Sequence, residues 1–369
     1  MVAVDDDDSG HSIAIWPDGG YWMRGVRKGR IRLGVCLFAC VLLAACERSP
    51  RMYERSLYVF GTLVSVSAWT SDEAAFDRAV DQIDRRFQSM HRDWHAWRGN
   101  GELVRLNQAL AAGESMRVSD FLLPLLIQGK ALYDASDGLF NPAIGRLIAL
   151  WGFHDDEPSG GLPPDPGAIA KLVDAAPGMD DVSIEGHRIR ATNPWIALDL
   201  GAYAKGHALN VAIRILHELG IDNAIVNAGG DLCVSGGHGG RPWHIGVRHP
   251  QGEGVIASLD ARDGECVLTS GNYERYREYA GVRYAHIIDP RSGYPVAHIA
   301  SATVIARNGA LADAAATALS VAGAPLWQRI AGRMGVDEVM LVDGDGRVYL
   351  TPAMKRRIDL TPTGGARGK

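Results

Sequence analysis

Residues 198–209 read LDLGAYAKGHAL and join a strand-like apolar run, residues 195–198, to a helix-like run that starts at residue 208. The glycines of this turn allow the backbone to approach a ligand closely, and the start of a helix offers unpaired N–H groups to an anion. Lys205 adds a charge that suits phosphate, whereas Asp199 suits a hydroxyl, a ring N–H or a metal. The spacing is neither that of a P-loop nor that of a dinucleotide-binding turn. The stretch is therefore either a ligand-binding turn or a helix cap with a solvated lysine.

The regions around this turn predict an α+β fold. Residues 58–69 alternate like a strand with Gly61 inside it, and residues 72–90 carry apolar residues at helical spacing. Residues 207–219 and the alanine-rich residues 311–321 read as helices, and short strands and hairpins lie between them. Because hairpins and helices do not alternate regularly, mixed or antiparallel sheets packed with helices are favoured over a doubly wound parallel sheet.

Length and charge limit the function classes. The chain has 369 residues, of which 47% are hydrophobic and 22% charged, as is usual for a globular protein with a sizeable core. Its formal net charge is −5, which argues against a general nucleic-acid binder. Beyond residue 46 no run of apolar residues is long enough to predict a membrane span.

The N-terminal region predicts export and a lipid anchor. Basic residues cluster between positions 24 and 32, and the apolar run 33–45 has the length of a signal peptide. It ends in LAAC, residues 43–46, which resembles a bacterial lipoprotein box with Cys46 as the lipidated (palmitate-bearing) residue. The alternative is a plain secretory signal with an incidental cysteine. We expect a signal peptide at 23–45, a tether at 46–56, and attachment to the periplasmic side of the inner membrane.

The predicted signal peptide bears on the residues before it and on the cysteines that follow it. The acidic run DDDD at residues 5–8 does not suit a signal peptide, so residues 1–22 are interpreted as a misassigned extension ahead of a start at Met23. If Cys36 and Cys40 are removed with the signal, Cys233 and Cys266 are the cysteines left in the body of the chain. They either form a disulfide in an oxidising periplasm or remain two buried thiols.

Three other stretches carry candidate chemistry. NAGGD, residues 227–231, places two glycines in a strand, which indicates a bulge or a ligand against bare backbone. His286 lies among arginines and tyrosines before an Asp-Pro turn, and is either a structural histidine or an acid–base group. Asp313 and Thr317 are four residues apart and so share one helix face, where they either bind Mg²⁺ through hard oxygen atoms or serve the helix itself.

Taken together, these stretches resemble the ApbE-type flavin transferases, many of which are periplasmic lipoproteins. The blocks that carry the resemblance, in the order typical of the family, are FGTLVSVSAW, LFNPAIGRLIALWGF, LDLGAYAKGHAL, NAGGDL, TSGNYERY, HIIDPRSGYPV and LADAAATALS. The resemblance implies one catalytic unit with a T-fold-like core at residues 57–352, followed by a flexible tail at 353–369. It also implies Mg²⁺-dependent cleavage of FAD, in which FMN passes to a threonine or serine of a target flavoprotein, as a phosphoester, and AMP leaves.

The same resemblance assigns roles to individual residues. It implies FAD binding by Phe60, Trp97, Gly138, Leu139, Phe140, Asn141, Asp199, Lys205, His286 and Ile287. Mg²⁺ would be bound by Asp313, Thr317 and the carbonyl groups of Ala202 and Ala316. His286 is the candidate base for the acceptor hydroxyl, which is a weak nucleophile unaided.

Three departures from the family pattern bear on activity. Ala202-Tyr203 stands where a double glycine is commoner and narrows the backbone's freedom, Phe60 stands in place of methionine, and Asn141 in place of aspartate. The leading hypothesis is a transferase that acts on a subunit of a membrane redox complex. The alternatives are an FAD pyrophosphatase that gives FMN and AMP, and a non-catalytic FAD-binding lipoprotein.

Overall fold

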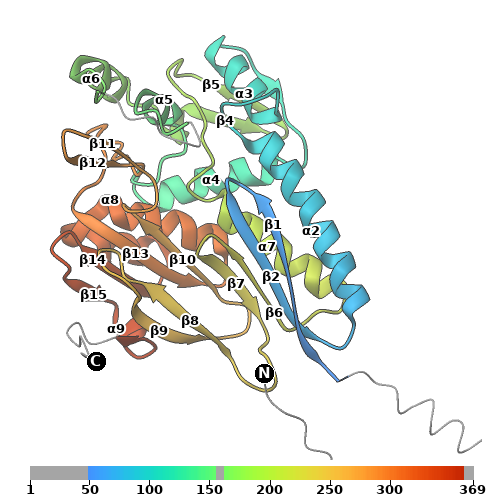
Figure 1. Cartoon of the computed structure of the whole chain (residues 1–369). Helices are drawn as coiled ribbons and strands as arrows, with labels where there is room; N and C mark the ends of the chain where they lie inside the picture. The colour runs from blue at the N-terminus through green and yellow to red at the C-terminus, as the bar shows by residue number, and fades with distance from the viewer. Residues whose placement is uncertain (1–48, 155–161, 361–369) are drawn as a thin grey trace, which may run out of the picture. The chain divides into compact units, whose positions relative to one another are not determined.

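An eight-stranded sheet, antiparallel throughout, forms the centre of the computed structural model, which describes residues 49–154 and 162–360 (Figure 1). Its strands, in spatial order, are β1 (Arg51–Val59), β2 (Thr62–Thr70), β6 (Ala224–Ala228), β7 (Asp231–Ser235), β10 (Cys266–Gly271), β13 (Ile299–Ala306), β14 (Glu338–Asp343) and β15 (Val348–Leu350). The predicted extension, the signal peptide and Cys46 lie outside the described residues. The predicted α+β class is confirmed.

Each face of the sheet is covered by a different layer. One face packs against the helices α2 (Glu73–Trp94), α7 (Ala204–Glu218) and α8 (Gly309–Met334). The other face packs against a three-stranded sheet of β16 (Asp359–Leu360), β9 (Val255–Ala261) and β8 (Trp243–Arg248). Side chains on a strand alternate between faces, so Leu232 and Val234 of β7 join the second core while Cys233 joins the first.

The remaining elements lie around one end of the sheet (Figure 1), except α9 (Pro352–Lys355), which packs against β14 and β15. They are α3 (Glu102–Ala111), β3 (Met116–Arg117), α4 (Leu123–Ala135), α5 (Gly145–Leu150), α6 (Pro166–Asp174), the 3₁₀ turn η1 (Met179–Asp181), β4 (Val182–Glu185), β5 (Arg188–Ala191), β11 (Tyr276–Tyr279), β12 (Val282–Ala285) and α9. β3, β5 and β4 form a small sheet, and β11 and β12 form a separate hairpin. Figure 1 shows α5, α6 and the β11–β12 hairpin together beyond one end of the central sheet.

The helix predicted at 72–90 is confirmed as α2. Asp72 caps it by accepting a hydrogen bond from the Ala75 amide, and the apolar side chains at helical spacing are buried against the sheet. Ile83 and Phe87 are fully buried. The periodic apolar stripe was therefore a sufficient signal for this element.

Three sequence expectations are corrected. The strand predicted at 58–69 is a hairpin, because Phe60 and Gly61 both adopt positive φ (58° and 72°) and reverse the chain between β1 and β2. β1 already begins at Arg51 and pairs with β2, so ordered structure starts inside the expected tether at 46–56. The tail expected from residue 353 contains most of α9 and all of β16, which pairs with β9 and so is held by backbone hydrogen bonds.

Cys233 of β7 and Cys266 of β10 are directly opposite each other and form a disulfide. Their Cα atoms are 3.9 Å apart, and both side chains are buried in the main core. Of the two alternatives left open by the sequence, a disulfide or two buried thiols, the structure has the disulfide. The register of the two antiparallel strands brings Cys233 and Cys266 together.

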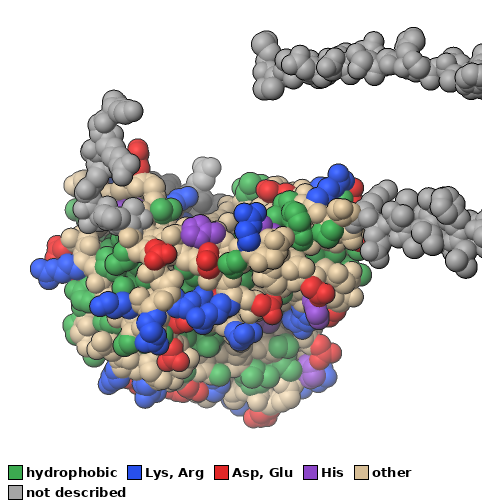
Figure 2. Space-filling view, turned by 90° about the horizontal axis from the view of Figure 1, so that it is seen from below, with side chains coloured by type: hydrophobic (Ala, Val, Ile, Leu, Met, Phe, Trp, Pro, Cys, Tyr) green, Lys and Arg blue, Asp and Glu red, His purple; other side chains and the backbone are tan. Residues whose placement is uncertain are grey.

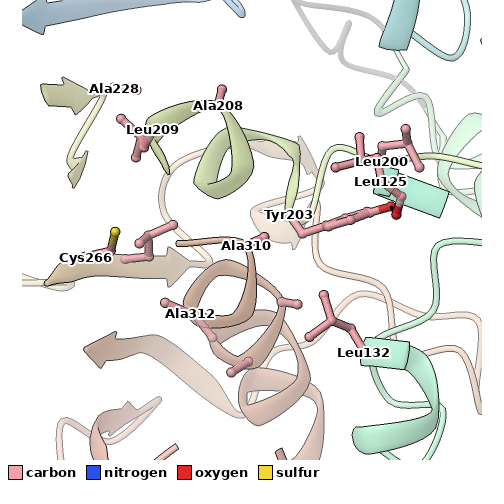
Figure 3. Close-up of a cluster of buried hydrophobic side chains, with 14 of the residues drawn as sticks. Leu125, Leu132, Leu200, Tyr203, Ala208, Leu209, Ala228, Cys266, Ala310 and Ala312 are labelled. Atoms are coloured by element: carbon pink, nitrogen blue, oxygen red, sulfur yellow. Dashed lines mark hydrogen bonds between the residues drawn. The ribbon is translucent and has the colours of Figure 1, made fainter. Parts of the chain in front are cut away.

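The helices α7 and α8 cross where both carry a glycine. A Cβ added to Gly206 would overlap the carbonyl of Gly309, and a Cβ on Gly309 would overlap the carbonyl of Gly206. Figure 3 shows small residues of both helices, Ala208 of α7 with Ala310 and Ala312 of α8, in the buried cluster around this crossing. Close backbone contact between the two helices therefore depends on the two glycines.

The helix predicted at 311–321 is the first part of α8. The backbone of α8 is non-helical at Gly323, two residues before Pro325, which accounts for the end predicted at residue 321. Within the described residues α8 is the single helix that is long and apolar enough to cross a membrane, and 72% of the stretch concerned is buried in the protein. Its apolar composition thus serves the core.

We predict that Gly309→Ala destabilises the protein by about 1–3 kcal/mol, because the added Cβ forces α7 and α8 apart. Gly332→Ala in the same helix is the matched control: no atom lies within 4 Å of its added Cβ, so we expect no loss and a gain of up to about 1 kcal/mol. Urea unfolding of both variants measures the difference. Equal stabilities would contradict the close backbone contact at this crossing.

Candidate functional site

A cavity of about 560 Å³ opens where segments distant in the sequence meet. The tip of the β1–β2 hairpin, the end of α2, the turn before α7, the segment after β12 and one face of α8 all contribute to its wall. The predicted site residues that line it are Phe60, Trp97, Leu139, Phe140, Asn141, Asp199, Ala202, Lys205, His286, Ile287, Asp313 and Thr317. The fold therefore brings most of the predicted set into one place.

Two predicted residues do not line the cavity. Gly138 lies in the turn after α4 with φ 76°, so it shapes the backbone that leads to Leu139 and Phe140. Ala316 is fully buried in α8, and its carbonyl oxygen accepts a hydrogen bond from the Ser320 hydroxyl. That bond engages the Ala316 carbonyl oxygen with a side chain of its own helix.

A second, more open cavity of about 640 Å³ lies between the β7–β8 connection, β9 and the C-terminal segment. Arginines and aspartates line it together, and it contains none of the predicted site residues. Figure 2, which views the protein from below, likewise shows basic and acidic side chains intermingled on that face. We therefore place the candidate site in the first cavity.

The apolar run before the turn is held by the side chain of Asn107 and by backbone hydrogen bonds to residues 142–145. The Asn107 amide group donates to the Leu198 carbonyl at 2.9 Å and accepts from the Leu198 amide at 2.8 Å. One isolated parallel bridge joins Ile144 to Ala197. The run predicted as strand-like at 195–198 thus forms one bridge and no regular strand, and Asn107 gives the segment a defined position.

Asp199 is oriented within the cavity by two donors. One carboxylate oxygen accepts from the Gly201 amide at 2.8 Å, and the other accepts from the indole N–H of Trp97 at 3.0 Å. Trp97 and Asp199 are therefore coupled, and both line the cavity. This pair presents an aromatic ring and a fixed carboxylate to a ligand.

Tyr203 anchors the turn to α4. Its side chain is fully buried, its hydroxyl donates to the Leu125 carbonyl at 2.8 Å, and burial raises its pKa. Figure 3 shows the Tyr203 ring reaching toward Leu125 and Leu200. Gly129 leaves the space for the hydroxyl, since a Cβ there would lie 2.6 Å from it. The residues Ala202-Tyr203 therefore suit the turn, and neither has a positive φ that would require glycine.

Asn141 is used for its amide group. Its nitrogen donates to the Pro177 carbonyl at 2.8 Å, and its oxygen accepts from the Ala143 amide at 2.9 Å. An aspartate could not make the first of these bonds, because an ionised carboxylate has no proton to donate. Asparagine, which replaces the aspartate typical of the family here, therefore makes a hydrogen bond to Pro177 that an ionised aspartate could not make.

Lys205 is paired in the cavity wall. Its ammonium group donates to Asp231, whose second oxygen accepts from the Thr269 amide at 3.0 Å. Burial alone would lower the pKa of Lys205, but Asp231, Asp313 and Glu274 raise it above its usual value. Lys205 therefore stays charged at every physiological pH.

Asp313 and Thr317 face the cavity from α8, as their spacing predicts. The buried Asp313 carboxylate accepts from the Gly206 amide, the first-turn N–H of α7, at 3.0 Å. The hydroxyl of Thr317 lies 3.3 Å from that of Ser270. Burial and the nearby Asp231 raise the pKa of Asp313 well above its usual value, although Lys205 opposes this.

The donor set near Asp313 is one of hard oxygen atoms. Among the residues described, no three His, Cys, Asp or Glu side chains converge as a metal cluster. A buried carboxylate in the same cavity wall as the hydroxyls of Thr317 and Ser270 suits Mg²⁺, which keeps several waters and shares phosphate oxygens with its substrate. These residues therefore fit a magnesium ion that binds together with a phosphate ligand.

His286 presents one ring nitrogen to the cavity. Its Nδ1 lies 3.1 Å from the Arg275 carbonyl and so must carry the proton that it donates there, which leaves Nε2 as an acceptor. Burial, with the charge of Arg275, lowers the pKa of His286 to about 4. The ring is therefore neutral at pH 7 and able to accept a proton.

Sequence reasoning left several lining or supporting residues without a role. Asp231 and Glu274 lie in the blocks NAGGDL and TSGNYERY, and desolvation raises the pKa of Glu274 above its usual value. Arg248 and Ser270 come from strands β8 and β10 and also line the cavity. In the sequence these residues are marked only by being polar and by lying within or just after strands. That pattern does not distinguish residues of the cavity wall from residues of the protein surface.

Comparison with known proteins gives concordant matches. The model of the ApbE family matches residues 60–340. An FAD:protein FMN transferase of Rhodobacter capsulatus is 45% identical over 343 residues, which cover 92% of this chain and 65% of that protein. One of Vibrio cholerae is 29% identical, covering 84% of this chain and 93% of that protein. The crystal structure of the ApbE protein of Thermotoga maritima superposes with a TM-score of 0.76 at 30% identity, covering 83% of this chain and 99% of that chain.

We predict a pH-dependent effect of Asp313→Asn on stability in EDTA. Because the raised pKa of Asp313 belongs to the folded state, the folded protein binds more protons than the unfolded chain above the usual aspartate range near pH 4. Wild-type stability therefore declines relative to the variant as the pH rises from 4 to 8. Thermal unfolding across that range, with the exposed Asp337→Asn as control, measures the difference. Parallel curves for wild type and Asp313→Asn would refute the assignment.

Proposed function

Because the chain belongs to the ApbE family, we propose that it is an FAD:protein FMN transferase. In the proposed reaction, a threonine or serine hydroxyl of a target protein attacks the phosphorus of the FMN half of FAD. The oxygen–phosphorus bond to the AMP half breaks, AMP leaves, and FMN remains on the target through a phosphoester. The observation that carries the proposal is the convergence of Asp199, Lys205, His286 and Asp313 on one cavity.

FAD binding is assigned to the aromatic and backbone-rich parts of the wall. Trp97, oriented by its bond to Asp199, offers a ring face to the flavin or adenine, and Phe60 offers another from the hairpin tip. Lys205 places a positive charge near the position for the pyrophosphate while Asp231 holds its ammonium group. This assignment is supported by the cavity wall, which contains Trp97, Phe60 and Lys205, and by the contact of Asp231 with Lys205.

Asp313 and Thr317, with the carbonyl of Ala202, would hold Mg²⁺. The Gly206 amide fixes the Asp313 carboxylate, and the Ser270 hydroxyl lies beside that of Thr317. When bound, Mg²⁺ supplies positive charge that neutralises the pyrophosphate and stabilises the leaving phosphate. The protein's part is to hold these oxygen ligands in fixed positions before the substrate arrives.

His286 is the proposed general base. Its neutral ring takes the proton of the acceptor hydroxyl on Nε2, while the Arg275 carbonyl holds the Nδ1 proton and fixes the tautomer. The imidazolium that forms can return the proton to solvent after AMP leaves. A pKa near 4 keeps the base unprotonated across the neutral range.

We further propose that the mature protein is anchored by a lipid on Cys46 at the periplasmic face of the inner membrane. The support is the basic cluster, apolar run and LAAC sequence of residues 24–46. A target subunit of a membrane redox complex would then lie within reach of the cavity.

The decisive experiment is incubation with FAD, Mg²⁺ and a co-expressed periplasmic subunit of a membrane redox complex. We expect mass spectrometry to find one added FMN on a threonine or serine of that subunit, with AMP in solution. Free FMN and AMP without a labelled subunit would instead identify an FAD pyrophosphatase. FAD that stays intact on the protein would identify a binding protein.

We predict that Asp313→Ala abolishes Mg²⁺-dependent turnover, because it removes the buried carboxylate from the metal ligands. Steady-state transfer assays measure the turnover. Retained turnover in Asp313→Ala would remove Asp313 from the metal site.

We predict that His286→Ala lowers kcat about 10²- to 10⁴-fold, the range for loss of a general base, and changes the Kd for FAD only a few-fold. Steady-state transfer measures kcat, and flavin fluorescence titration measures the Kd. Equal losses of kcat and FAD affinity would refute the role of His286 as base.

A further inference from the structure

The outward face of the β1–β2 hairpin carries an exposed apolar pair. Tyr58 and Leu63 are directly opposite each other across the two strands and are 75% and 59% exposed. The next pair along the hairpin on this face is Ser56 with Ser65. The opposite face of β1 is buried against α2 through Tyr53 and Val59. The exposed pair, which we call the Tyr58–Leu63 pair, is therefore not needed to hold the hairpin to the core.

This pair lies beside the hairpin tip, whose residues line the cavity. The two residues between β1 and β2, Phe60 and Gly61, line the cavity, as does Thr62 at the start of β2. Figure 1 shows the hairpin turn at the same end of the sheet as α4 and the start of α7. An extended chain advances about 3.3 Å per residue, so a polypeptide with one side chain in the cavity passes the pair within a few residues.

We propose that the Tyr58–Leu63 pair docks the acceptor polypeptide by contacting an apolar side chain two to four residues from its acceptor threonine or serine. This inference rests on the proposed function, since a transferase to proteins must bind a polypeptide at the rim of its cavity. Two large apolar side chains that lie directly opposite each other and are bordered by polar residues form one contiguous contact surface. Tyrosine in particular offers a large contact area with little loss of conformational freedom.

The size of the surface favours a substrate over a second copy of the chain. A stable dimer buries about 1,200–2,000 Å² in total, far more than two side chains can supply. A contact of two side chains instead suits a segment that must leave after FMN is attached. The side chains of Ser56 and Ser65 beside the pair are small and leave room for an extended segment.

The test uses the double substitution Tyr58→Ser with Leu63→Ser, assayed with the redox-complex subunit and FAD described above. We expect the KM for the subunit to rise about tenfold or more, while kcat at saturating subunit and the Kd for FAD stay unchanged. Met52→Ser is the matched control, because Met52 is exposed on the same face at the far end of the hairpin, opposite Trp69. It should leave the KM unchanged.

The outcomes separate this inference from the proposed function. If wild type labels the subunit and the double variant has the KM of Met52→Ser, the docking role is wrong and the proposed function stands. If wild type labels no acceptor, both fail. Light scattering gives the oligomeric state: a wild-type dimer that the double substitution makes monomeric, with transfer unchanged, would assign the pair to self-association and overturn the inference.

Discussion

The hydrogen bond from the Gly206 amide to the Asp313 carboxylate couples the two helices on which the site depends. It can form because Gly206 and Gly309 let α7 and α8 approach backbone to backbone. The bond gives a first-turn N–H of α7 a buried partner and fixes an acid that would otherwise be oriented only by its own helix. Lys205, one residue before Gly206, is thereby held near Asp313.

The charges gathered at this crossing support the proposal that the site binds a cation together with a phosphate. Asp231 and Asp313 are buried, and the charge of Lys205 opposes the rise in the pKa of Asp313. One lysine beside two buried carboxylates leaves an excess of negative charge in a region of low dielectric, which is costly unless a proton or a cation compensates it. The raised pKa of Asp313 reflects this, because a proton bound to the Asp313 carboxylate removes one of the negative charges. A magnesium ion would replace the proton and leave positive charge available to a pyrophosphate.

Local patterns in the sequence were reliable wherever the determinant was local. The helical spacing of α2 and the four-residue spacing of Asp313 and Thr317 both gave the right face. The β1–β2 turn was missed because Phe60 at φ 58° is not a usual turn residue, and no Asn-Gly or Asp-Gly pair marks it. The pairing of Lys205 with Asp231 was also missed, since the register of β6 and β7 decides which polar residue faces α7.

Tyr203 shows how a change that looks unfavourable in the sequence can be favourable in the fold. Replacing a double glycine by Ala202-Tyr203 removes backbone freedom, but the turn needs no positive φ at either residue. Instead the Tyr203 ring fills the space beside Phe140, edge-on at 5.3 Å, and its hydroxyl satisfies the Leu125 carbonyl of α4. The cavity-lining residues Ala202 and Lys205 flank this anchor, so a buried side chain supplies the rigidity. A preorganised turn of this kind binds charge without first having to be ordered.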